Sequence, residues 1–117
     1  MMHVFVTFQI PGFHQWANAP DEHGYLASQH RHVFHFRVDI QVEGHDRSVE
    51  MIEFKNIARD TIFSTHSRAF GSHVDFGGQS CEEIAFSLSS ALQIKGYNVK
   101  KVEVSEDGEN GAVVHES

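Results

Sequence analysis

The sequence lacks the features that cysteine-rich, membrane-spanning and nucleic-acid-binding proteins need. It contains one cysteine, Cys81, and no apolar run of the roughly 18 residues that span a membrane. A lone cysteine excludes an internal disulfide and a zinc site built from several thiolates. With 9 Lys and Arg against 16 Asp and Glu, the formal net charge is -7 and no basic patch is present. We therefore expect neither nucleic-acid nor membrane binding.

Apart from an excess of histidine, the composition is that of an ordinary globular protein. The chain has 117 residues, 40% of them hydrophobic, and we expect residues 1–117 to form a single domain. Its first residues alternate between apolar and polar, unlike the apolar block of a signal peptide, so we expect a cytoplasmic protein. Ten histidines are present. Any metal site must therefore use histidine and carboxylate ligands.

Two alternating stretches predict the first two strands. Residues 2–10 alternate with a period of two, and Pro11 and Gly12 are expected to end that strand. Residues 17–29 are expected to form a loop. Residues 30–43 alternate again, which places His30 and His32 on the same face as the apolar side chains that follow.

The second half predicts two helices and two further strands. After a short extended segment, "VEMIEF", helical spacing begins at Phe54 and should fade near Gly71, with a loop over 71–79. Ser80 and Glu83 form a capping-box signal for the second helix. The stretches "VEV" and "AVVH" flank hairpin-type turns and predict the last strands. The order ββααββ predicts an α+β fold, a four-stranded antiparallel sheet with two helices on one face.

The opposite face of such a sheet needs cover. Apolar and aromatic residues occur on both faces of the second strand. A monomer with scattered exposed apolar residues is the alternative, since single exposed residues of this kind are normal. We expect a homo-oligomer that covers this face.

A histidine pair on the second strand suggests a metal site. His30 and His32 project from one face roughly 6.5 to 7 Å apart, which follows from the strand rise. His14, after the first strand, can supply a third ligand and leave a position open for water or substrate, as catalytic zinc sites require. His35 faces the other way. An H-x-H pair is a weak signal in a chain rich in histidine, and a cupin-like site is disfavoured because no glutamate follows at the required spacing.

Taken in order, these residues resemble the 6-pyruvoyltetrahydropterin synthase and 6-carboxytetrahydropterin synthase family. The resemblance rests on His14, on the H-x-H pair, and on "MIEF", "SCEEIA" and "VEVSED", and it covers nearly the whole chain. It implies the tunnelling fold, assembled into trimers or hexamers with sites between subunits. It also implies Zn²⁺ held by His14, His30 and His32, and dihydroneopterin triphosphate as substrate. One branch of the family serves deazapurine (queuosine) biosynthesis.

The resemblance also implies ligand-binding residues. Glu106 matches a glutamate that binds the guanidine-like edge of the pterin ring, and a carboxylate can accept two parallel hydrogen bonds there. Ser80 and Cys81 match a stretch that lines the ring pocket, where free N–H groups at a helix start suit a ring carbonyl or an anion.

The proton-transfer residues of the family are incompletely present. Leu26 stands where related enzymes have a catalytic cysteine or glutamate, and Thr65 replaces an aspartate beside His66. His66 and Cys81 remain candidate catalytic residues, Cys81 because a helix N-terminus can lower a thiol pKa. The alternative for Cys81 is a packing role. Other candidate bases or relay groups are Glu22, His23, Tyr25, His73 and Asp75.

Three functions therefore stay open. The leading hypothesis is a zinc-dependent lyase or hydrolytic enzyme acting on a pterin or purine-like substrate. The second is a non-catalytic protein of the same fold that binds a pterin, purine or nucleotide. The third is an oligomeric interaction module whose histidines lie on its surface.

Overall fold

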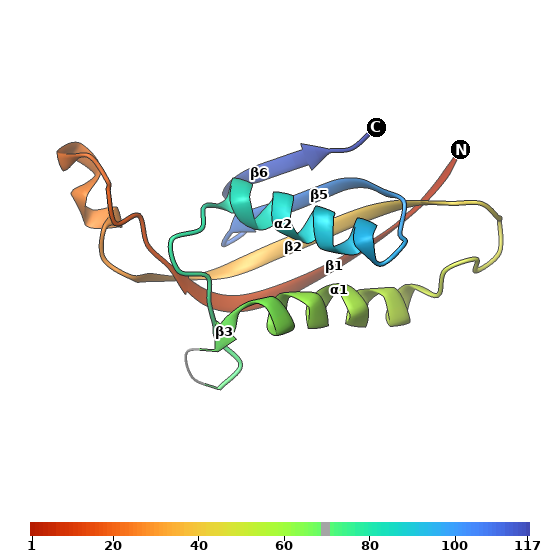
Figure 1. Ribbon diagram of the computed structural model, residues 1–117, viewed down its shortest axis with the longest axis horizontal. Helices are drawn as coiled ribbons and strands as arrows, with labels where there is room; N and C mark the ends of the chain where they lie inside the picture. The colour runs from red at the N-terminus through yellow and green to blue at the C-terminus, as the bar shows by residue number, and fades with distance from the viewer. Residues whose placement is uncertain (69–70) are drawn as a thin grey trace.

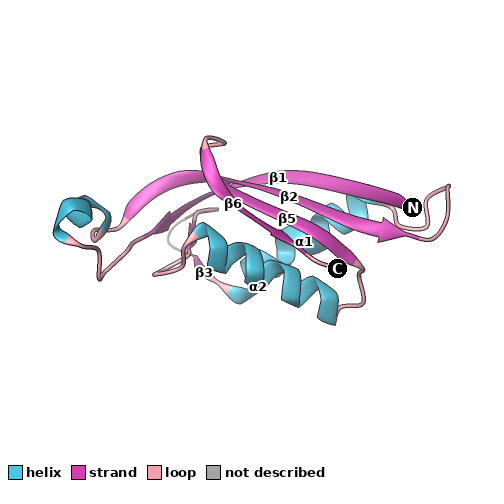
Figure 2. Ribbon diagram, turned by 90° about the horizontal axis from the view of Figure 1, so that it is seen from above, coloured by secondary structure: helices cyan, strands magenta, loops and turns pink. Residues whose placement is uncertain are grey.

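The computed structural model describes residues 1–68 and 71–117. Two long antiparallel strands form the centre of one six-stranded sheet, whose strand order is β3-β4-β1-β2-β5-β6. Two helices lie side by side on one face of this sheet (Figures 1 and 2). In chain order the elements are β1 (Met2–His14), the 3-10 segment η1 (Asp21–Leu26), β2 (His30–Val42), α1 (Met51–Thr65), β3 (Ser67–Arg68), β4 (Val74–Asp75), α2 (Cys81–Ile94), β5 (Val99–Glu106) and β6 (Asn110–His115).

The core lies between the sheet and the two helices. Strand alternation turns Phe8 and Phe36 inward, where their rings stack at 4.8 Å between centroids. Helical spacing in α1 and α2 supplies the opposing layer. The fully buried side chains from both layers include Ile10, Phe34, Val38, Ile40, Phe54, Ile62, Ile84, Leu88, Leu92 and Val102.

The predicted α+β arrangement is confirmed, but the sheet has six strands where the sequence predicted four. The additional strands, β3 and β4, have two residues each, and β4 pairs in parallel with β1 at Gly12 and Phe13. Gly12 permits this approach, because a Cβ atom there would lie 2.8 Å from the Val74 carbonyl oxygen. Strands of two residues have no measurable alternation, so the sequence pattern did not indicate them.

Three predicted boundaries are wrong. The first is the end of α1, which lies at Thr65, because His66 is extended and β3 begins at Ser67, well before Gly71. Pro11 does not end β1, which stays paired with β2 as far as His14. A proline is tolerated there because β4 covers the other side of β1 only at Gly12 and Phe13, which leaves most of that edge open. The segment expected to be extended before Phe54 is already helical, since α1 begins at Met51, and the side chain of Glu50 accepts a hydrogen bond from the Glu53 N–H.

Within the described residues, the longest helices are α1 and α2. Neither α1 nor α2 is long and apolar enough to cross one.

Gly111 should be the glycine most sensitive to substitution on this sheet. A Cβ atom at this position of β6 would meet the Val104 carbonyl oxygen and lie 2.6 Å from Ser105 Cα. Both are backbone atoms of the paired strand, so relief requires separating β5 from β6. We expect Gly111→Ala to reduce the free energy of unfolding by about 1 to 3 kcal/mol, the usual range for overpacking. Gly24→Ala, where nothing lies within 4 Å of the added atom, is the matched control in urea denaturation. Equal midpoints for the two variants would contradict this packing.

Candidate metal and ligand site

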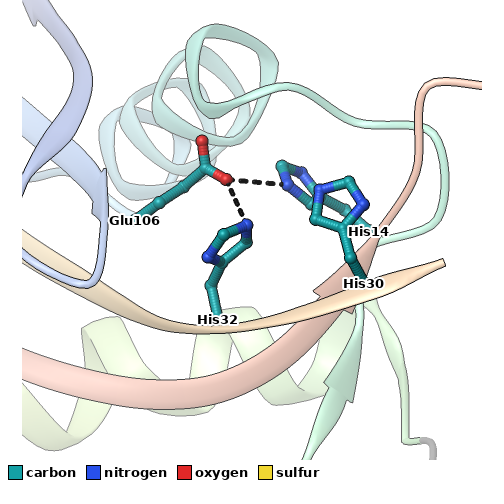
Figure 3. A group of neighbouring side chains, drawn as sticks. All are labelled: His14, His30, His32 and Glu106. Carbon is teal, nitrogen blue, oxygen red and sulfur yellow. Dashed lines mark hydrogen bonds and ion pairs between the residues drawn. The ribbon is translucent and has the colours of Figure 1, made fainter. Parts of the chain in front are cut away.

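Three strand ends bring four potential metal ligands together. His14, the last residue of β1, pairs directly with His30, the first residue of β2, and His32 follows on the same face. Glu106 is the last residue of β5, the neighbour of β2 on the other side. Figure 3 shows the four side chains converging. One donor atom from each lies within 4.8 Å of the others. The structure thus brings together the three predicted ligands and the predicted ring anchor.

Each of the three imidazoles is oriented by an oxygen on its outer side. The Nδ1 atom of His14 lies 3.0 Å from the Gln79 carbonyl oxygen, and that of His30 lies 2.9 Å from the Ser28 carbonyl oxygen. The Nδ1 atom of His32 lies 2.7 Å from Asp107 Oδ2. Since these oxygens only accept, each Nδ1 carries the proton in our assignment. The Nε2 atoms then face inward, those of His14 and His32 toward Glu106 Oε2, and a cation bound there would take the place of these contacts, an arrangement typical of metal-binding histidines.

Glu106 lies against two of these imidazoles. Its Oε2 atom lies 3.0 Å from His14 Nε2 and 2.6 Å from His32 Nε2, the contacts drawn in Figure 3. Three imidazole nitrogens are ligands that zinc accepts in a site whose fourth position is open to water or substrate. The donor set present fits Zn²⁺.

Asp107 holds His32 in place, and the sequence did not reveal this role. Its carboxylate accepts hydrogen bonds from His32 Nδ1 and, at 2.9 Å, from the Val33 N–H. The first of these bonds, followed by the second, lowers the pKa of Asp107, so it stays ionised as an acceptor. Asp107 adopts a left-handed φ of 57° in the hairpin between β5 and β6, which places it beside β2. The only sequence signal was an aspartate adjoining Glu106 before a glycine turn.

A cavity of about 480 Å³ opens beside these ligands. It is bounded by the end of β1, the first turn of α2 and the β5–β6 hairpin. Trp16 is 47% exposed, and its backbone N–H bonds the Leu26 carbonyl oxygen at 2.7 Å. The lining residues are His14, Gln15, Trp16, Leu26, His30, Gly78, Gln79, Ser80, Cys81, Glu82, Glu83, Glu106, Asn110 and Gly111.

Ser80 and Cys81 line this cavity, but the Ser80 N–H is not free and the pKa of Cys81 is not low, as the sequence had led us to expect. The Ser80 N–H is already bonded to Glu83 Oε1 at 3.2 Å, within a complete capping box. It is therefore not free for a ring carbonyl or an anion. The expected low pKa of Cys81 is wrong: burial, followed by the negative charges of Glu106 and Glu82, raises the pKa of this thiol to about 12. Cys81 is a protonated packing group, the alternative considered above.

The Cys81 thiol should react slowly in the folded protein. At pH 8 its raised pKa leaves almost no thiolate, so we expect a disulfide reagent to modify it at least about 100-fold more slowly than in urea-unfolded protein. The chain has one cysteine, so the signal has a single source. The unfolded chain releases this proton near pH 9.0 and the folded state near pH 12, so stability should also fall as pH rises between these values. Rates within tenfold of one another would contradict this environment.

The structure places His66 apart from the larger cavity. It lines a second cavity of about 130 Å³ with residues of α1 and α2. Its Nε2 atom lies 2.6 Å from Gln79 Oε1, and its Nδ1 atom lies 3.0 Å from the Ile62 carbonyl oxygen. Gln79 also bonds His14 through its main chain, so one residue connects the two cavities. Sequence reasoning missed Gln79.

The other candidate bases are scattered. Glu22, His23 and Tyr25 lie on η1, which projects from one end of the molecule (Figure 1), and Tyr25 is 73% exposed. Asp75 accepts a hydrogen bond from the Gly77 N–H at 2.8 Å. His73 and Asp75 are not among the described residues that line the larger cavity.

Comparison with known proteins supports the fold. No family model and no curated protein matches the sequence. Among solved structures, the chain is similar to the 6-pyruvoyl tetrahydropterin synthase of Caenorhabditis elegans, with a TM-score of 0.69 and 14% identity over 99% of this chain and 96% of that one. It is also similar to an uncharacterized protein from Wolinella succinogenes, with a TM-score of 0.64 and 13% identity over 99% of this chain and 98% of that one. The chain has the α+β tunnelling fold.

Proposed function

We propose that this chain is a zinc-dependent protein of the pterin synthase type that acts on a pterin or purine-like substrate. One observation carries the proposal: three imidazoles, each fixed by an oxygen at Nδ1, bring one ligand atom each within 4.8 Å of the others at the wall of a cavity. Surface histidines of an interaction module would not need three such orienting partners. The resemblance of the sequence and the fold of the C. elegans enzyme agree with this reading.

The residues present can hold both the metal and a ring. His14, His30 and His32 would hold zinc, which when bound lowers the pKa of a coordinated hydroxyl or water. Glu106 offers a carboxylate to an exocyclic amine and a ring N–H, and Trp16, which is about half exposed and stacks against His23, offers a flat apolar surface. These groups would bind and orient the substrate with its side chain toward the histidines.

A second candidate, a protein that binds such a ligand without turnover, has its own support. Leu26 lines the cavity where the resemblance implies a base, and a leucine cannot take a proton. Cys81 is protonated near neutral pH. His66 lies on the second cavity.

Metal analysis and product analysis test both candidates. We expect protein purified without a histidine tag to contain about one zinc per chain. Zinc-loaded protein would then be incubated with dihydroneopterin triphosphate and with dihydroneopterin, and the products followed by mass spectrometry. Turnover of either compound supports the enzyme, and binding without products supports the second candidate. Absence of zinc, with no ligand bound, would overturn both.

We also propose that the protein is a homo-oligomer, a trimer or hexamer. The sheet face opposite the helices presents Phe5, which is 51% exposed, and Val113, which is 47% exposed. In addition, β6 is the last strand of the sheet, so its outer edge is free to pair with another copy. Light scattering at micromolar concentration should give a mass of three or six chains, each of 13.2 kDa. A mass of one chain would contradict this assembly.

A further inference from the structure

Gln79 belongs to the walls of both cavities and contacts one histidine in each. Its main-chain oxygen accepts a hydrogen bond from His14 Nδ1 at 3.0 Å, in the larger cavity. Its side-chain amide oxygen lies 2.6 Å from His66 Nε2, in the smaller cavity. Gln79 therefore connects His66, which follows the end of α1, with the candidate metal ligand at the end of β1.

His66 uses both of its ring nitrogens in contacts within the chain. Nδ1 lies 3.0 Å from the Ile62 carbonyl oxygen, which only accepts, so Nδ1 carries a proton in our assignment. Nε2 faces the amide of Gln79, whose oxygen and nitrogen exchange places by a flip, so the amide can accept from this nitrogen or donate to it. The ring also packs edge-on against Phe76, with 4.9 Å between the centroids. These contacts fix the ring and engage both nitrogens, one of which a proton-transfer residue would have to present to a substrate.

The loop before Gln79 explains why its main-chain oxygen depends on a fixed side chain. Gly77 and Gly78 precede it, and Gly77 has a left-handed φ of 59°. Glycine has the widest choice of backbone conformations, so a peptide that follows two glycines is weakly constrained by its own sequence. The Gln79 N–H donates to the Phe76 carbonyl oxygen at 3.1 Å, and the contact with His66 ties the same residue to the end of α1. His66 thus helps to set the direction of the oxygen that orients the metal ligand.

We propose that His66 is a positioning residue of the metal site, which acts through Gln79 to hold His14 in the orientation that brings Nε2 toward the other ligand atoms. This role rests on the proposed zinc site and deepens it. It replaces the proton transfer that the sequence suggested for His66. Loss of a residue that orients a metal ligand typically costs about 10- to 100-fold in metal affinity, and His66 acts one residue further out, so we expect a loss of about 10-fold.

Replacing His66 by alanine and by glutamine tests this role. His66→Ala removes the contact with Gln79 and should weaken zinc binding by about 10-fold. A glutamine can place its amide near the position of Nε2 and bond Gln79, but it cannot transfer a proton, so His66→Gln should keep zinc affinity within about threefold of the wild type. Ser87→Ala alters the wall of the same cavity, keeps both Gln79 contacts and is the matched control. Competition with a chromophoric chelator measures zinc affinity, and urea denaturation checks that each variant folds.

A double variant shows whether the two residues act through one contact. Gln79→Ala keeps the main-chain oxygen that His14 contacts and removes the side chain that His66 contacts. It should therefore weaken zinc binding as much as His66→Ala does. The two substitutions together should cost about 10-fold, because both delete the same interaction. A combined loss of about 100-fold would show two independent effects and would contradict the connection between the residues.

The other results separate this role from the proposed function. Zinc affinity in His66→Ala within about twofold of the wild type would overturn the positioning role and leave the zinc site standing. An equal loss in His66→Ala and His66→Gln would show that the contact with Gln79 is not the cause, and would also overturn it. A wild-type protein that binds no zinc would overturn the proposed function, and this role with it.

Discussion

Replacing His32 by alanine should abolish stoichiometric zinc binding while the protein stays folded. The variant removes one of three convergent nitrogens and also leaves Asp107 without the hydrogen bond that orients it. Loss of a residue that only orients a ligand typically costs about 10- to 100-fold in metal affinity. Loss of a ligand itself should therefore weaken zinc binding by more than about 100-fold.

The same strand provides the matched control. His35 lies on β2 three residues further along, on the opposite face, and pairs with Gln9 and Ser105. His35→Ala removes one imidazole from the chain and should leave zinc affinity unchanged within about twofold. Competition with a chromophoric chelator measures both variants, and circular dichroism checks their folding. If the two substitutions weaken zinc binding equally, the histidines act as nonspecific surface ligands and the proposed site is wrong.

Replacing Glu106 by glutamine should separate ligand binding from metal binding. Glutamine keeps the shape of the side chain but has one acceptor oxygen, so it cannot accept two parallel hydrogen bonds from a ring edge. Hydrogen bonds to a charged group are worth about 1.5 to 3 kcal/mol, so ligand affinity should fall by about 10- to 100-fold. Zinc should stay bound through the three histidines, with affinity reduced by less than about 10-fold, because catalytic zinc sites need three protein ligands.

Glu109→Gln is the control for this variant. Glu109 lies in the same hairpin as Glu106, is exposed, and is not among the described lining residues of the larger cavity. Isothermal titration with neopterin should give wild-type affinity for Glu109→Gln and a clear loss for Glu106→Gln. Unchanged ligand affinity in Glu106→Gln would show that this carboxylate is not the ring anchor. Loss of zinc as well would instead make it an essential metal ligand.

The metal-binding residues could be brought together from the sequence because strand alternation is a local property. His30 and His32 share a face with Phe34 and Phe36 through the period of two, and this pattern is visible without a structure. The end of the partner strand, β1, could not be predicted from the sequence. Sequence signals ended β1 at Pro11, whereas pairing with β2 extends it to His14 and places that residue opposite His30. Pairing with β2 determines where β1 ends, and local sequence propensity carries no information about that pairing.

The residues that support the site depend on contacts far apart in the chain. Gln79 orients His14 from 65 positions away through a main-chain oxygen, so its side-chain type gives no signal. Asp107 orients His32 across 75 positions. Likewise, the low pKa expected for Cys81 followed from its place at a helix start, but burial raises the pKa instead. The capping box of Ser80 and Glu83 was predicted correctly, although its consequence, the loss of a free N–H, emerged only with the geometry of the bonds.

Anomalous diffraction at the zinc edge, from crystals of untagged protein grown with zinc, tests the central claim most directly. We expect a single strong peak per chain, within coordination distance, roughly 2.0 to 2.1 Å, of the Nε2 atoms of His14, His30 and His32. A peak located elsewhere, or no peak with the three imidazoles still in their present orientation, would contradict it.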